Sequence, residues 1–141
     1  MTSKEYLKQI EYLENEAEHL RFELDSAEST MSCISAIRYD KIKVQNGTQQ
    51  HEAGFERQID RVYELREALI CKIAEVNLKR HEIISVLSKL PNINQSKLLF
   101  KLYVEHKPIG KCAEELNYSY DYTLELHKKA LSAVKVPEHA A

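Results

Sequence analysis

The sequence predicts an all-α protein in which an N-terminal long helical hairpin or coiled-coil arm (residues 1–90) precedes a three-helix helix-turn-helix module (residues 91–141). Only three glycines and three prolines occur in 141 residues, too few turn formers for a protein of many short strands. Apolar residues recur with a coiled-coil spacing at the start of the chain. Beyond Pro91, short apolar stripes separated by capping and turn residues replace that long pattern.

The first helix is expected from about Ser3 to Ile37, because apolar residues alternate at intervals of four and three along it. Charged residues, mostly glutamates, lie between these positions and form a solvated face. Two alanines within the apolar seam predict close approach of a partner helix. The seam comprises Tyr6, Ile10, Leu13, Ala17, Leu20, Leu24, Ala27, Met31 and Ile34.

Residues 38–54 interrupt this pattern with polar residues and the turn dipeptide Asn46-Gly47. We therefore expect a long loop there, and a loop of that length suggests mobility or a functional contact. A short strand over Tyr39–Val44 is an alternative.

A second helix is expected from about Phe55 to Leu90, where Pro91 stops it. Two apolar strips on one helix usually have two neighbours. The first helix folded back as an antiparallel hairpin is one candidate; the C-terminal module or a second subunit is the other. The main strip comprises Phe55, Ile59, Val62, Leu65, Leu69, Ile73, Val76, Ile83, Leu87 and Leu90, and the second comprises Tyr63, Ile70, Leu78, Ile84 and Val86.

Three short helices are expected after Pro91. The first, Gln95–His106, carries one stripe formed by Leu98, Leu99, Leu102 and Tyr103. Pro108 suits the first position of the next helix, which runs to about Leu116. Asn117 can take the left-handed conformation that ends it. Ser119 is a good N-cap for a last helix, from Tyr120 to about Val134, and Pro137 lies beyond its end.

The last two helices match a helix-turn-helix, because a tight Asn-Tyr-Ser connection joins them and Ala113 allows close approach. Projection of the last helix at about 100° per residue divides it into an inner and an outer face. The outer face would enter a major groove if the protein reads DNA. The inner face comprises Thr123, His127, Ala130, Leu131 and Val134, and the outer face Asp121, Tyr122, Glu125, Lys128, Lys129 and Ser132.

Several stretches carry a resemblance to known proteins: Leu102–Ile109, Cys112–Leu116, Ser119 and Lys128–Leu131. They resemble the fourth region of sigma-70-type factors, which holds the −35 promoter element. More closely, the chain resembles a domain-of-unknown-function family of small phage and prophage proteins from Gram-positive bacteria. The matching stretches are Ser3–Leu7, Lys79–Ile84, Tyr118–Tyr120 and Leu126–Leu131. Members pair a coiled-coil hairpin with a sigma-like helix-turn-helix. The chain is similar, more distantly, to phage late-operon regulators of the ArpU type.

The resemblance implies transcriptional regulation and a set of DNA-binding residues on the last helix and beside it. Sigma factors commonly place basic residues where this chain has Tyr120, Tyr122 and Leu124, and no arginine follows Arg80. Bidentate readout of guanine by arginine is therefore absent from this module. Tyrosines can contact phosphate or stack, and Glu125 can accept from cytosine. The expected DNA-binding set is Tyr120, Asp121, Tyr122, Glu125, Lys128, Lys129, Lys111 and Ser119.

Other chemistry has little support in the sequence. Three cysteines at unrelated spacings, without a Cys-x-x-Cys pair, predict reduced thiols in a host cytoplasm. No two of the six histidines lie three or four residues apart, the spacing of metal ligands on a helix. No motif places a general base beside a nucleophilic side chain. We therefore expect no metal site, no cofactor, no membrane span and no enzyme activity. Net charge is −2, with 7 basic and 6 acidic residues after residue 90, so DNA binding depends on local lysine placement.

The predicted function is that of a phage-type transcriptional regulator that binds double-stranded DNA through its helix-turn-helix. The arm would provide homodimerisation, a contact with RNA polymerase, or both. One alternative is a coiled-coil interaction or assembly protein whose C-terminal bundle binds protein and never meets DNA. A DNA-packaging recognition subunit is another, since such proteins also combine these two elements.

Overall fold

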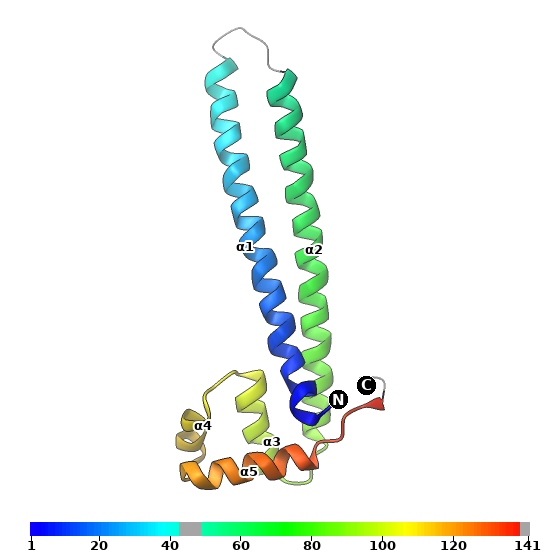
Figure 1. Ribbon diagram of the computed structural model, residues 1–141, viewed down its shortest axis with the longest axis vertical. Coiled ribbons are helices and arrows are strands. Elements are labelled where there is room, and N and C mark those ends of the chain that lie inside the picture. Colours follow the sequence, from blue (N-terminus) through cyan, green and yellow to red (C-terminus); the bar gives the residue numbers. More distant parts are fainter. Residues whose placement is uncertain (43–48, 139–141) are drawn as a thin grey trace. The chain divides into compact units, whose positions relative to one another are not determined.

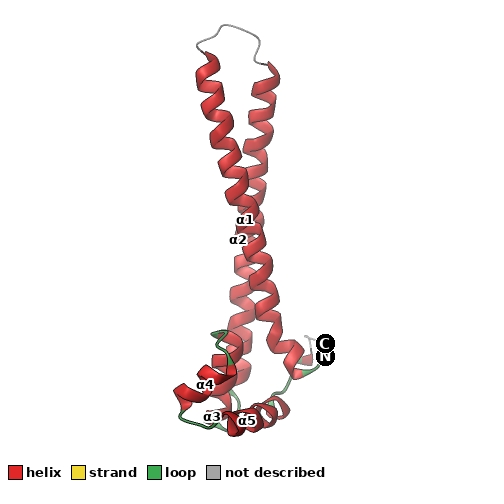
Figure 2. Ribbon diagram, turned by 60° about the vertical axis from the view of Figure 1, so that its left-hand side comes forward, coloured by secondary structure: helices red, strands yellow, loops and turns green. Residues whose placement is uncertain are grey.

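The computed structural model describes residues 1–42 and 49–138, which are helical with no strand among them (Figure 1, Figure 2). The predicted all-α class is therefore confirmed. None of the helices in these two ranges is long and apolar enough to cross a membrane. The elements are α1 (Ser3–Ile42), α2 (Gln49–Ser88), α3 (Ile93–Leu99), the π-helical segment η1 (Phe100–Val104), α4 (Ile109–Leu116) and α5 (Tyr120–Ala133).

The long loop predicted over residues 38–54 is wrong for most of its length, because α1 continues to Ile42 and α2 begins at Gln49. The alternative strand is also wrong where it overlaps α1. Residues 38–42 and 49–53 contain no glycine or proline, and the single glycine that follows, Gly54, does not stop α2. The Asn46-Gly47 turn signal lies in residues 43–48, outside the described residues.

One compact unit comprises residues 15–74, where α1 and α2 run antiparallel side by side. Leu24, Ala27 and Val62 form its buried centre, as the apolar seam predicts. Two ion pairs follow the antiparallel order, Lys72–Glu16 at 2.7 Å and Arg66–Glu28 at 2.8 Å. Ion pairs at a protein surface contribute little to stability, so apolar contact holds this unit together.

The other compact unit combines residues 1–14 with residues 75–141. Its largest core cluster draws on the first turns of α1, the end of α2, and α3 and α5. The helix-turn-helix thus shares its core with the ends of both long helices. The compact unit therefore does not begin at Pro91, where the second helical pattern of the sequence stops. The cluster comprises Tyr6, Leu7, Ile10, Ile83, Leu87, Leu99, Ala130 and Val134.

Candidate nucleic-acid interface

The turn between α4 and α5 has the geometry of a helix-turn-helix. Asn117 takes the left-handed conformation predicted for it, with φ 59° and ψ 39°. The Tyr118 N–H donates to the Ala113 carbonyl at 2.9 Å, and the Asn117 N–H donates to the Glu114 carbonyl at 3.2 Å. These two bonds form the Schellman arrangement, which satisfies the carbonyls at the end of α4 and turns the chain sharply.

Ser119 caps the start of α5, as predicted. Its hydroxyl oxygen accepts from the Tyr122 N–H at 3.2 Å, and the Thr123 hydroxyl donates to the Ser119 carbonyl at 2.8 Å. At the start of α4, Pro108 is the N-cap and not the first helical residue as predicted. Its ψ of 150° is extended, so the helix begins one residue later at Ile109.

A small apolar cluster fixes α5 against α3 and α4. Leu98, Cys112 and Leu126 form its buried centre. Burial raises the pKa of the Cys112 thiol, so this cysteine acts as a packing residue. All five predicted inner-face residues of α5 are buried or half-buried. Leu126 is buried as well, a contact that the projection did not identify.

Glu115 joins α4 to the segment that precedes it. Its carboxylate accepts from Lys101 at 2.8 Å and from Lys107 at 3.0 Å. Hydrogen bonds from these two ammonium groups lower the pKa of Glu115 to about 2. Both lysines are therefore engaged within the module.

His127 is a packing residue at the edge of α5, as predicted. Its Nε2 lies 2.9 Å from the Tyr103 hydroxyl, within hydrogen-bond distance, and the two rings stack. Burial, with a smaller contribution from the positive charge of Lys4, lowers the pKa of His127. The imidazole is therefore neutral at pH 7 and does not add to the positive charge of this surface.

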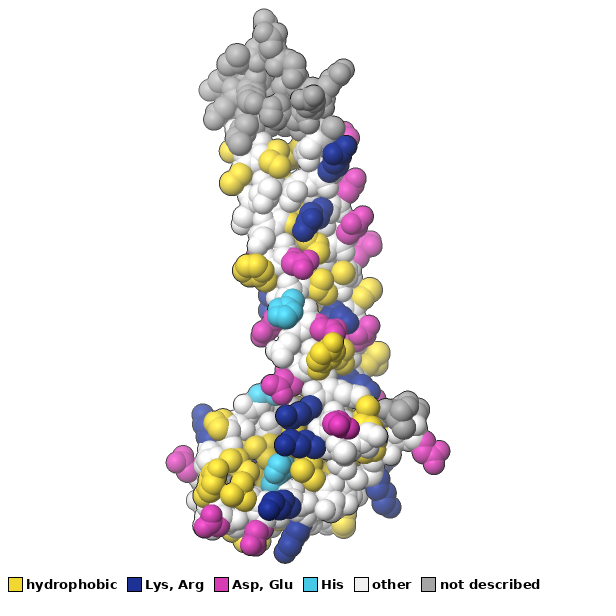
Figure 3. Space-filling view, viewed as in Figure 1, with side chains coloured by type: hydrophobic (Ala, Val, Ile, Leu, Met, Phe, Trp, Pro, Cys, Tyr) yellow, Lys and Arg dark blue, Asp and Glu magenta, His cyan; other side chains and the backbone are white. Residues whose placement is uncertain are grey.

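The outward face of α5 is open to solvent. Tyr120 is 54% exposed and Tyr122 is 47% exposed. The Tyr122 ring packs edge-on against Tyr118 with centroids 4.9 Å apart, which holds it at the start of the helix. Figure 3 shows apolar, acidic and basic side chains together over this region. The remaining predicted residues, Asp121, Glu125, Lys128 and Lys129 on α5, Lys111 on α4 and the cap Ser119, are also exposed.

The sequence did not indicate how the loop before α4 is held. Glu14 of α1 forms an ion pair with Arg80 of α2, and its carboxylate also contacts the imidazole of His106 in this loop; His106 has a positive φ of 57°. Spacing along the chain carries no signal for such a contact, because its members lie far apart in sequence.

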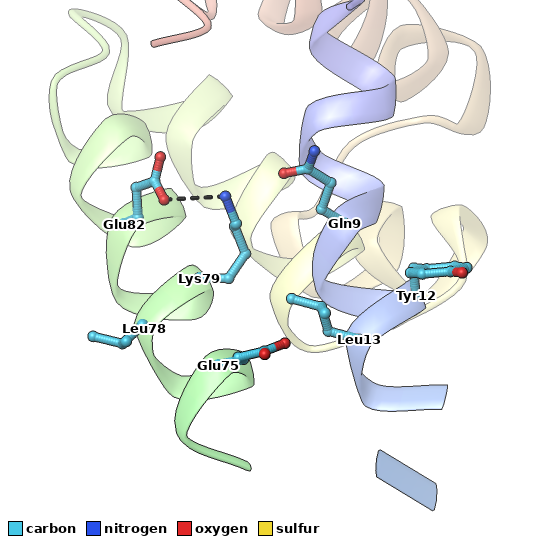
Figure 4. Close-up of a pocket in the computed structure, with 7 residues that line it drawn as sticks. All are labelled: Gln9, Tyr12, Leu13, Glu75, Leu78, Lys79 and Glu82. Atoms are coloured by element: carbon cyan, nitrogen blue, oxygen red, sulfur yellow. Dashed lines mark hydrogen bonds and ion pairs between the residues drawn. The ribbon is translucent and has the colours of Figure 1, made fainter. Parts of the chain in front are cut away.

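A groove of about 440 Å³ lies between α1 and α2 (Figure 4). Lys79 pairs with Glu82 at 3.2 Å, and Glu82 also accepts from the Tyr6 hydroxyl at 2.9 Å. Lys79, Glu82 and the Tyr6 hydroxyl are therefore paired with one another at this groove. It is lined by Gln9, Tyr12, Leu13, Glu75, Leu78, Lys79 and Glu82.

No family model, curated protein or solved structure matches this chain. Among residues 1–42 and 49–138, no group of three or more histidine, cysteine or carboxylate side chains is placed to hold a metal ion. The functional interpretation therefore depends on the geometry around α5.

Proposed function

We propose that this chain is a phage-type transcriptional regulator that binds double-stranded DNA through α5. The observation that carries the proposal is the α4–α5 turn. A left-handed Asn117, a buried Ala113 and the Ser119 cap hold α4 and α5 in the arrangement of a helix-turn-helix. This arrangement leaves a continuous outer face on α5 that can enter a major groove. The resemblance to sigma-like phage regulators supports a role in transcription.

The outer face divides by chemistry. Lys128 and Lys129 lie in the second half of α5 on long, flexible side chains and would contact phosphate. Asp121, Tyr122 and Glu125 lie nearer the start of the helix, where residues of such helices reach base edges. Substituting a base-reading residue is expected to change preference among sequences by about 1–3 kcal/mol. Substituting a lysine is expected to weaken binding to every sequence alike.

The test begins with unbiased selection of DNA fragments that the protein retains. Fluorescence anisotropy then compares selected and scrambled duplexes at two salt concentrations. Tyr122→Ala and Glu125→Ala should reduce the difference in affinity between the two duplexes, whereas Lys128→Gln should lower both affinities by the same factor. Equal affinity of the wild type for both duplexes, unchanged in Tyr122→Ala and Glu125→Ala, would refute sequence-preferring binding. That result would favour the protein-docking alternative.

We also propose that the chain is a homodimer. Tyr63 and Ile70 of α2, within residues 15–74, are 60% and 67% exposed, and Leu78, in the other compact unit, is 72% exposed. Exposed apolar side chains that gather on one surface mark a protein–protein contact. Ile84 and Val86, predicted in the same strip, are instead half-buried in the unit that contains the helix-turn-helix. Light scattering should report twice the chain mass of 16.4 kDa. A monomer at high micromolar concentration would contradict the dimer.

A further inference from the structure

The first turn of α1 is held in one place by its own cap. The Thr2 hydroxyl oxygen accepts from the Glu5 N–H at 3.2 Å, and the Glu5 carboxylate accepts from the Thr2 N–H at 2.8 Å. This reciprocal pair is a capping box. Glu5 is the carboxylate nearest to Lys4 in the sequence. The capping box directs its negative charge toward the positive N-terminal end of the helix.

The same turn is attached to the C-terminal half of α5. Tyr6, Leu7 and Ile10 are fully buried in the cluster that contains Ala130 and Val134. The Ser3 hydroxyl donates to the carbonyl of Val134 at 3.4 Å. Residues from opposite ends of the chain therefore hold the start of α1 beside α5 within one compact unit.

This attachment places one exposed lysine, Lys4, next to the proposed DNA-binding helix, and a second exposed lysine, Lys8, follows it along α1. Lys4 and Lys8 lie one helical turn apart on α1, on the same side. The charge of Lys4 acts on His127, at the inner edge of α5. Lys128 lies about 100° further around that helix, toward its outer face. In Figure 3, basic side chains and a histidine follow one another down the face of this unit.

The added charge matters because the outer face of α5 is nearly neutral, with Asp121 and Glu125 offsetting Lys128 and Lys129. Affinity for duplex DNA depends on cations that contact phosphates. We infer that the first two turns of α1 form part of the DNA interface, where Lys4 and Lys8 contact the phosphates beside the groove that α5 enters. This inference rests on the proposed function and extends its site to a second segment of the chain.

The experiment measures duplex affinity against salt concentration for the full chain and for Lys4→Gln/Lys8→Gln. Each lost phosphate contact reduces the slope of log affinity against log salt by about 0.9, so the double variant should lose about 1.8. Selected and scrambled duplexes should weaken by the same factor. Lys4→Arg/Lys8→Arg keeps both charges and should retain the wild-type slope.

The matched control is Arg57→Gln/Arg61→Gln, which removes two exposed positive charges from α2 within residues 15–74. It should leave the slope unchanged. A wild-type slope in Lys4→Gln/Lys8→Gln, or an equal loss in the control, would overturn the inference while the proposed function stands. A wild-type protein that binds no duplex would refute the proposed function and this inference with it.

Discussion

Replacing Ile10 with alanine tests how firmly the start of α1 is held in the core beneath the helix-turn-helix. The Ile10 side chain is fully buried in the cluster that also contains Leu99 and Ala130. The change removes roughly three methylene-sized groups, at about 0.8 kcal/mol each. The cavity left behind adds to this loss, so the free energy of unfolding should fall by about 3 kcal/mol, within the range of about 2–5 kcal/mol typical of such changes.

Urea unfolding followed by circular dichroism measures this loss, at one fixed protein concentration because a dimer would add to the apparent stability. With a slope of about 2 kcal/mol per molar urea, the midpoint should fall by about 1.5 M. Ile93→Ala is the matched control, since it removes the same atoms from a side chain that is 68% exposed. Its free energy of unfolding should change by less than about 0.5 kcal/mol. Equal midpoints for the two variants would refute the buried position of Ile10.

Three further predictions concern the helix-turn-helix. Asn117→Ala should cost about 1–2 kcal/mol in thermal melts, because its φ is positive, whereas Asn117→Gly should not. The pKa of Glu115 in the folded protein is about 2, below its ordinary 4.5, so its stabilising contribution is complete above about pH 5 and is lost toward pH 2. Glu115→Gln should remove that part of the acid dependence in urea titrations. The pKa of His127 is lowered from 6.5, so the unfolded chain takes up the proton first and stability should fall as pH drops below about 6.5. An NMR titration of His127 with a midpoint above 6.5 would contradict this.

Local signals in the sequence were sufficient for much of the fold. The alternating intervals between Tyr6 and Ile34 predicted the buried side of α1, and Ser119 and Asn117 marked the two sides of the helix-turn-helix turn. These features depend on residues close together along the chain. The ends of the long helices were misjudged because polar residues are compatible with both a loop and a solvent-facing helix. Pro108 was misplaced by one position because its fixed φ suits both an N-cap and a first helical turn.

Contacts between segments that lie far apart in the chain could not be predicted from such local signals. Nothing in the spacing of Glu14, Arg80 and His106 indicates that these three side chains meet. The same holds for the effect of the Lys4 charge on the pKa of His127, which follows from how the start of α1 packs against α5. The exposed face of α5 was predicted because one helix carries all its members, whereas the start of α1 shares a core with α5 only in the folded chain.

The core shared by the start of α1 and the end of α5 is built from segments that the ribosome makes at very different times. Ser3 and Val134 are 131 residues apart in the chain. At about 5–20 residues per second, a ribosome would need roughly 7–26 s to pass from one to the other. During that interval Tyr6, Leu7 and Ile10 lack their partners on α5, so these apolar side chains stay uncovered until the C-terminal segment has been made. A nascent chain stalled before Ala130 should therefore expose them to chaperones and proteases.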